Sequence, residues 1–170
     1  MCHRADGFVR HLTAGEILMQ IFRVQQLLRQ TGDRLRNLVL MGMGEPFANY
    51  EAVTQALDVA AHTPGWGIGP SRMSVSTVGL VPAIVRFADE RRLQALAVSL
   101  HAATDAERSA LLPVNQRWPL SELMRALRYY CEKSGKKVFI GWTLIAGRND
   151  SADHARVLTE LLQGVRAHVN

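Results

Sequence analysis

Apolar and polar positions along the 170-residue chain follow two periods, one helical and one extended. The first helix is predicted over residues 13–32, where Thr13 and Glu16 have the spacing of a capping box and Gly32 closes the helix. The other predicted helices cover residues 51–62, 80–92, 120–135 and 151–165, with a short one after residue 103. Apolar runs predict strands at residues 37–42, 72–79, 93–102 and 136–147, and residues 166–170 resemble the start of a fifth strand.

Helices that alternate with apolar strands predict an α/β fold with parallel strands and right-handed crossovers. The nearly continuous apolar runs predict strands that are buried on both faces. The chain has no low-complexity segment, internal linker or short-period repeat, so we expect residues 1–170 to form a single domain. Ligands of such folds bind at the carboxyl ends of the strands, and the residues that follow each strand are therefore the functional candidates.

Short polar side chains and glycines follow four of the predicted strands. They are Gly42, Gly44 and Glu45, then Ser76 and Thr77, then Ser99 and His101, and finally the run "AGRND". Glycines allow the backbone to approach a ligand closely, a carboxylate suits an ammonium or a ribose hydroxyl, and together these groups can line a pocket for a small polar molecule. Structural alternatives remain open: a solvated glutamate in a turn, hydroxyls bonded to local backbone, and a hydrogen-bonded histidine.

Composition narrows the class of protein. The hydrophobic fraction of 48% and the charged fraction of 21% are typical of a globular protein. No apolar run approaches the length of a membrane span and the N-terminus is polar, so we expect a cytoplasmic protein without membrane contact. The net charge of +5 suits a nucleic-acid partner, although solvated helix faces explain the arginines equally well.

The chain resembles a known enzyme family through five segments that follow in order over nearly its whole length: "GFVRHLTAGEI", "NLVLMGMGEPFANYEAV", "SVSTVGLVPAI", "AVSLHAATDAERSALLPVN" and "IAGRNDS". The family is the radical S-adenosylmethionine (SAM) methyltransferases that methylate carbon 2 of an adenine in 23S ribosomal RNA and, in some cases, in transfer RNA. The resemblance implies a partial (β/α) barrel of parallel strands with outer helices. It also implies two cofactors, SAM and a 4Fe–4S cluster.

The resemblance implies cofactor-binding roles for six residues. Gly44 and Glu45 are similar to the glycine–glutamate pair that meets the amino group of SAM. Ser76 is similar to the serine of the next strand that contacts SAM, and the remaining candidates are Ser99, Leu100 and His101, which are similar to the stretch that completes the site. Glu45 is therefore expected to accept a hydrogen bond from the ammonium of SAM.

The resemblance also implies partners and a reaction, although no catalytic residue is assigned here. In this family one SAM yields a 5′-deoxyadenosyl radical, and a second SAM methylates a cysteine near the C-terminus. We therefore expect ribosomal RNA as the substrate, transfer RNA as a further one, an electron-donor protein as a partner, and a monomeric enzyme. The protein orients cofactor and base, while the cofactors supply the difficult chemistry.

The chain departs from the family pattern at both ends. The family holds its cluster with three cysteines in the motif C-x3-C-x2-C, whereas only Cys2 stands here, one residue closer to Gly7 than usual. Cys2 is either the last ligand of a truncated motif or an unrelated residue. Cys131 lies in a helical pattern and is predicted to be a small, semi-buried thiol.

We expect the accessory RNA-binding domain, the start of the cluster loop and the last barrel strands to be missing from residues 1–170. The chain alone is then expected to be inactive in methylation and, with open sheet edges, prone to aggregate. The alternative is a cluster-free α/β module that retains SAM, nucleotide or RNA binding without catalysis.

Overall fold

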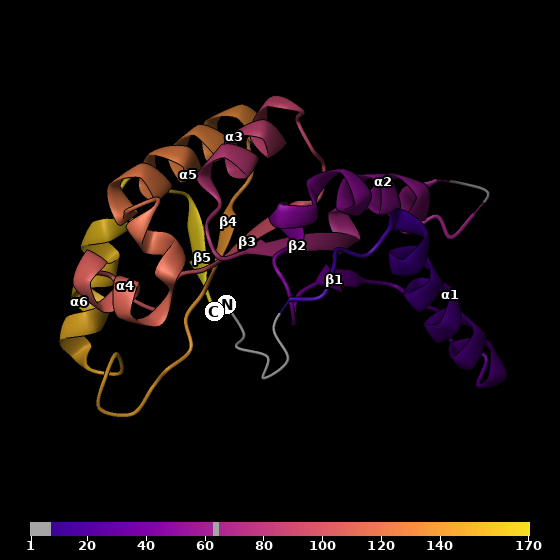
Figure 1. Cartoon of the computed structure of the whole chain (residues 1–170), viewed down its shortest axis with the longest axis horizontal. Coiled ribbons are helices and arrows are strands. Elements are labelled where there is room, and N and C mark those ends of the chain that lie inside the picture. The colour runs from indigo at the N-terminus through magenta and orange to yellow at the C-terminus, as the bar shows by residue number, and fades with distance from the viewer. Residues whose placement is uncertain (1–7, 63–64) are drawn as a thin grey trace.

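The described part of the chain, residues 8–62 and 65–170 of a computed structural model, alternates helices and strands (Figure 1). The strands are β1 (Leu38–Leu40), β2 (Met73–Thr77), β3 (Ala95–Ser99), β4 (Val138–Gly141) and β5 (Ala167–Val169). The α-helices are α1 (Ala14–Gln30), α2 (Tyr50–Ala61), α3 (Val81–Asp89), α4 (Asp105–Leu111), α5 (Leu120–Ser134) and α6 (Ala152–Leu161). Short 3-10 helices occur at Pro46–Asn49 (η1), Pro70–Arg72 (η2) and Pro113–Gln116 (η3).

The five strands form one parallel sheet in the order β1-β2-β3-β4-β5. Each strand pairs with the one that follows it in the sequence, so the sheet advances in one direction. The α/β prediction is confirmed, as is the fifth strand that was expected from residues 166–170. Consecutive parallel pairing with a connection between each pair is the arrangement from which (β/α) barrels are built.

Helices cover one face of this sheet. Figure 1 shows α2, α3 and α5 following one another as an arc on the same side of the strands. The strand side chains that face them are buried: Met73, Val75, Leu96, Val98, Val138 and Ile140. They join buried residues of the helices, among them Leu57, Ile84, Phe87, Leu123, Leu127 and Tyr130, in one hydrophobic core. Each large apolar side chain buried in this way stabilises the fold by about 1.5–3 kcal/mol.

The opposite face of the sheet differs from the prediction, which had both faces buried. Strand register places Val39, Ser74, Ala95, Phe139 and His168 on this second face. Val39 is 53% exposed and Phe139 is 42% exposed, because no helix of the described residues packs on this side. The apolar runs were correctly assigned to strands, but they do not report that both faces are covered.

Local sequence signals explain where helices begin and end. The capping box of α1 is present: the Thr13 hydroxyl accepts from the Glu16 backbone N–H, and the Glu16 carboxylate accepts from the Thr13 backbone N–H. Pro82 lies in the first turn of α3, where its missing N–H costs nothing. Gly135 follows α5 with a left-handed φ of 70°. None of the described helices is long and apolar enough to cross a bilayer.

Candidate functional site

The loop after β1 is shaped by two glycines and anchored by one aromatic ring. Gly42 and Gly44 have φ values of +114° and +91°, which favour glycine strongly, and a Cβ added to either would meet no atom within 4 Å. Phe47, in η1, is buried and packs against the ring of Phe87 with centroids 5.4 Å apart. The anchored ring fixes the loop, while the space beside the glycines stays open to a ligand.

Glu45 lies in this loop as the residue that caps η1. Its carboxylate accepts one hydrogen bond from the Phe47 backbone N–H at 3.0 Å and another from the Val78 backbone N–H at 2.8 Å. Burial raises the pKa of the Glu45 carboxyl, and these backbone bonds oppose that effect. Glu45 is therefore not the solvated turn residue of the structural alternative, because it ties the tip of β1 to the tip of β2.

Ser76 and Thr77 end β2 and point in opposite directions, as alternation along a strand requires. Ser76 lies on the face without helices, next to Ala97 of β3 in the register. Thr77 lies on the helix side, where its hydroxyl accepts from the backbone N–H groups of Gly79 and Leu80. The backbone-binding alternative is thus confirmed for Thr77, while Ser76 remains directed toward the open face.

The three candidates after β3 have different environments. Ser99 lies on the open face beside Gly141. The Leu100 side chain is fully buried in the core, and its backbone N–H donates to the Gly141 carbonyl at 3.0 Å. His101 has a left-handed φ of 60°, and its Nδ1 accepts from the Thr143 backbone N–H at 3.0 Å. Burial, with a smaller effect of Arg108, lowers the pKa of His101, which suits a neutral ring that accepts at Nδ1.

Asn149, from the run "AGRND", braces the tip of β4. Its amide nitrogen donates to the carbonyls of His101 at 2.8 Å and Thr143 at 2.9 Å, and its amide oxygen accepts from the Ile145 backbone N–H at 2.6 Å. The side chain is buried and fully used by the backbone. The fourth strand end therefore stiffens the rim of the site, and the predicted strand of residues 136–147 ends earlier, at Gly141, because its second half forms this braced loop.

Arg108, on α4, was not a candidate in the sequence, and the structure places it directly behind the strand tips. Its side chain is fully buried, and Nη2 donates to the Val78 carbonyl at 2.6 Å and, at 3.5 Å, to the Ser99 carbonyl. Nη1 donates to Asn115 at 2.9 Å. The sequence does carry a signal of its burial. Arg108 precedes Leu111 by three residues and Leu112 by four, which places it on the apolar side of a short helix.

The candidates therefore gather at the carboxyl ends of neighbouring strands, where Glu45 is half-buried and Ser76 is only 8% exposed. Glu45 is linked to β2 through Val78, and Arg108 links Val78 to the end of β3. Ser76 and Ser99 lie on the open face of the same strands. The structure brings these groups to the carboxyl end of the sheet, where ligands of parallel folds bind.

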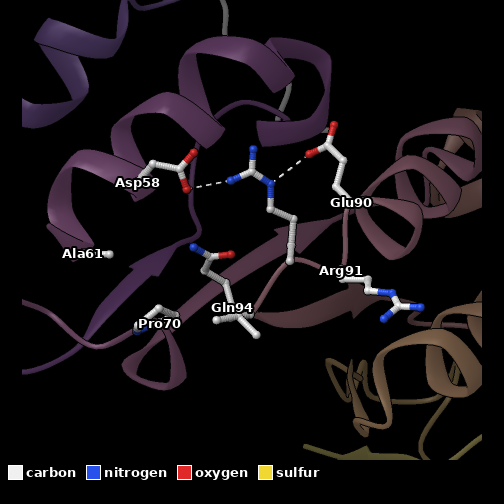
Figure 2. Close-up of a pocket in the computed structure, with 8 residues that line it drawn as sticks. Asp58, Ala61, Pro70, Glu90, Arg91 and Gln94 are labelled. Atoms are coloured by element: carbon white, nitrogen blue, oxygen red, sulfur yellow. Dashed lines mark hydrogen bonds and ion pairs between the residues drawn. The ribbon is translucent and has the colours of Figure 1, made fainter.

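A separate depression of about 490 Å³ lies at the other end of the sheet, between α2 and the start of β3 (Figure 2). Arg92 crosses it, donating to Asp58 at 2.6 Å and to Glu90 at 2.8 Å. These charges neutralise one another across α2 and the α3–β3 connection. Because this depression lies at the amino ends of the strands, we assign a structural role to the residues that line it.

The one residue predicted for metal binding, Cys2, lies outside the described residues, so its role as a cluster ligand stays a prediction. Cys131 is buried on α5 with its Sγ directed to the Arg166 carbonyl at 3.6 Å, which confirms the interpretation of a small core thiol. Within residues 8–62 and 65–170, no three His, Cys, Asp or Glu side chains are grouped to hold a metal ion.

Comparison with known proteins gives close relatives. No protein-family model matches the chain. The chain is 57% identical over 164 residues to the dual-specificity RNA methyltransferase RlmN 1 of Myxococcus xanthus, an alignment of 96% of this chain and 46% of that protein. Probable dual-specificity RNA methyltransferases of Opitutus terrae and Geobacillus thermodenitrificans are 47% and 46% identical, with 46% and 45% of their lengths covered.

A solved structure gives the same result. The chain superimposes on a radical SAM methyltransferase from Sphaerobacter thermophilus with a TM-score of 0.94 and 45% identity, over 97% of this chain and 48% of that one. The resemblance to radical SAM RNA methyltransferases is therefore confirmed over almost the whole chain, and with it the barrel type of fold. The chain spans about half the length of the curated relatives it matches.

Proposed function

We propose that this chain, a homologue of the radical SAM RNA methyltransferases, forms the SAM-binding part of an enzyme that methylates carbon 2 of an adenine in RNA. Ribosomal RNA is the proposed substrate and transfer RNA a second one. The observation that carries the proposal is the gathering of Glu45, Ser76 and Ser99 at the carboxyl ends of three adjacent parallel strands, with Ser76 and Ser99 on the face that no described helix covers.

The chemistry of these groups fits the methionine part of SAM. An α-ammonium needs acceptors, and the Glu45 carboxylate offers the lone pairs that Phe47 and Val78 leave free. The Ser76 and Ser99 hydroxyls can donate to a carboxylate or accept from an amino group. Gly42 and Gly44 leave space beside Glu45 for a ligand to approach. The half-buried position of Glu45 strengthens its attraction for a cation relative to a surface carboxylate.

The residues of this chain do not fit a 4Fe–4S cluster. Such a cluster needs three cysteine thiolates with SAM on the fourth iron, and the sequence contains two cysteines, one of which, Cys131, is enclosed in the core. The residues of this chain therefore supply no cluster-dependent step of the reaction. In the complete enzyme, radical chemistry belongs to the cofactors, and the role of these residues is to hold SAM in a fixed orientation at the strand tips.

The experiment that tests the proposal is SAM binding by calorimetry with Glu45→Ala and, as a matched control, Glu132→Ala on the exposed side of α5. Loss of a charge-assisted hydrogen bond predicts at least tenfold weaker binding for Glu45→Ala and unchanged binding for Glu132→Ala. Equal affinities in the two variants would overturn the assignment of Glu45. Anaerobic iron–sulfide reconstitution is expected to leave the visible spectrum of the chain without a 4Fe–4S band. Methylation of an RNA fragment by this chain alone would contradict the conclusion that its residues cannot hold the cluster.

A second candidate function is a binding module without catalysis, which retains affinity for SAM or for RNA. The observation that favours it is the same shortage of cysteines. SAM affinity without a reconstituted cluster is expected of both candidates. The DNA immediately upstream of the start codon separates them, because only the enzyme requires two further cysteine codons there in frame.

A further inference from the structure

We propose that Arg108 is a positioning residue for the site: its buried guanidinium holds the backbone of Val78 in place, and through Val78 it sets the position of Glu45. The inference rests on the proposed function for its consequence, which is tighter binding of SAM. Its physical basis is a single residue, Val78, whose two backbone groups are bonded one to Glu45 and the other to Arg108. The Val78 N–H donates to Glu45 at 2.8 Å and the Val78 carbonyl accepts from Arg108 at 2.6 Å.

The guanidinium is itself held from behind. Asn115 accepts from Nη1 of Arg108 at 2.9 Å and is buried. The Asn115 amide nitrogen donates to Asp105 at 2.8 Å, and the other bond to this Asp105 oxygen comes from the Leu120 backbone N–H at 2.8 Å. A continuous series of hydrogen bonds thus leads from the start of α5, through α4, to the tips of β2 and β1.

Burial of the Arg108 guanidinium costs free energy, so a contribution to stability does not explain its position, whereas fixing the backbone around it does. Arg108 is fully buried, makes no direct ion pair among the described residues, and leaves its Nε without a partner there. Burial lowers the pKa of its guanidinium to about 10, so it stays charged at neutral pH. An apolar side chain of similar volume would fill the space at lower cost, and a buried charge is therefore poor evidence for stability. What only a guanidinium supplies here is a rigid donor fork, with Nη2 bonded to the Val78 and Ser99 carbonyls and Nη1 bonded to Asn115.

The two ends of the series have different relations to the cofactor site. Glu45 is the proposed partner of the SAM ammonium, whereas Arg108 lies on the helix side of the strand tips and donates inward to their carbonyls. Removing Arg108 frees the Val78 carbonyl, and Val78 can then shift together with the carboxylate bonded to its N–H. Such misplacement costs affinity although no contact to SAM is removed.

The test is a double-mutant cycle on SAM affinity at one temperature, with Arg108→Met, Glu45→Gln and the double variant. Arg108→Met is expected to weaken SAM binding about tenfold in the presence of Glu45 and less than about threefold in the Glu45→Gln background, because both changes disable the same unit. Equal factors in the two backgrounds, or no effect of Arg108→Met, would overturn the proposal. Arg108→Lys retains one donor and is expected to restore part of the affinity.

Arg128→Met is the matched control, because Arg128 also bonds a backbone carbonyl, that of Gln163, but far along α5 from the strand tips. Its SAM affinity is expected to be unchanged. A second readout needs no SAM: hydrogen exchange of the Val78 amide is expected to accelerate about tenfold in Arg108→Met relative to the Leu162 amide, which bonds Leu158 within α6. Equal acceleration at both amides would mean general destabilisation and would overturn the proposal.

The two readouts separate this inference from the proposed function. Absence of SAM binding by the unsubstituted chain would overturn the proposed function and the cofactor consequence of Arg108 together. Hydrogen exchange at Val78 would still decide whether Arg108 holds the tip of β2. Should Arg108→Met not fold, Arg108→Lys carries the same comparison, and an unchanged Val78 amide in that variant would count against the proposal.

Discussion

Gly79 provides a direct measure of how tightly the tip of β2 is packed. It follows Val78, the residue whose N–H bonds Glu45 and whose carbonyl bonds Arg108, and it is buried with a φ of +106°. A Cβ built on Gly79 would lie 3.2 Å from Nη2 of Arg108 and 3.3 Å from both methyl carbons of Leu123. Gly79→Ala therefore presses directly on the guanidinium that we propose as the positioning group.

The expected cost has two parts. Holding a non-glycine residue at a φ of +106° costs about 1–3 kcal/mol, because L-residues rarely occupy that region. Overpacking of a well-filled site costs about a further 1–3 kcal/mol. The neighbours cannot give way cheaply, since Leu123 is fully buried and Arg108 is held by Val78 and Asn115. We therefore expect Gly79→Ala to lower the free energy of unfolding by about 2–6 kcal/mol.

Gly135→Ala is the matched control, because it carries backbone strain without crowding. Gly135 ends α5 with a φ of +70°, and a Cβ built there meets no atom within 4 Å. It is expected to cost about 1–2 kcal/mol. Urea unfolding followed by circular dichroism measures both variants. A Gly79→Ala variant no less stable than Gly135→Ala would refute the packing of Arg108 and Leu123 against the tip of β2.

Two further predictions concern the proposed SAM site. Burial raises the pKa of Glu45, so its carboxylate is protonated at a higher pH than an exposed one. As pH falls, SAM affinity is therefore expected to begin to decrease above the pH at which an exposed carboxylate titrates, and calorimetry should find this pH dependence reduced in Glu45→Gln; an equal dependence in that variant would contradict the assignment. Ser76→Ala is expected to weaken SAM binding about fivefold to tenfold through loss of one hydrogen bond, whereas Ser74→Ala, two residues earlier on the same face, should leave it unchanged. Equal effects of the two serine variants would remove Ser76 from the site.

Much of the fold was predictable because its signals are local. Thr13 and Glu16 mark the start of α1 through their own side chains, and Gly135 marks the end of α5. Strands of a parallel sheet are marked by apolar runs, and each of the five predicted strands is present in one parallel sheet. These runs do not indicate which face of the sheet will be covered, because that depends on where helices far along the chain pack. Val39 and Phe139 have apolar side chains on the uncovered face for this reason.

The site was predictable in part for a related reason. Residues that follow strands converge whenever the strands are parallel neighbours, so Glu45, Ser76 and Ser99 could be grouped without coordinates. The role of Arg108 could not be predicted: its helical spacing indicates burial, but the backbone carbonyls through which it acts have no sequence signature. Asn149 is a similar case: its position after a strand was noted, but its three bonds to backbone groups depend on how two loops meet.

The two interpretations of Glu45, as a structural residue and as a ligand for an ammonium, are physically compatible. If the carboxylate served only to cap η1 and accept from Val78, a neutral acceptor such as the asparagine or serine side chain that caps other helices would do so without the cost of desolvating a charge. A carboxylate has lone pairs beyond the two that Phe47 and Val78 use, and those bonds fix the direction of the rest. The backbone contacts therefore preorganise the carboxylate, and an incoming cation recovers the free energy that burial of its charge costs.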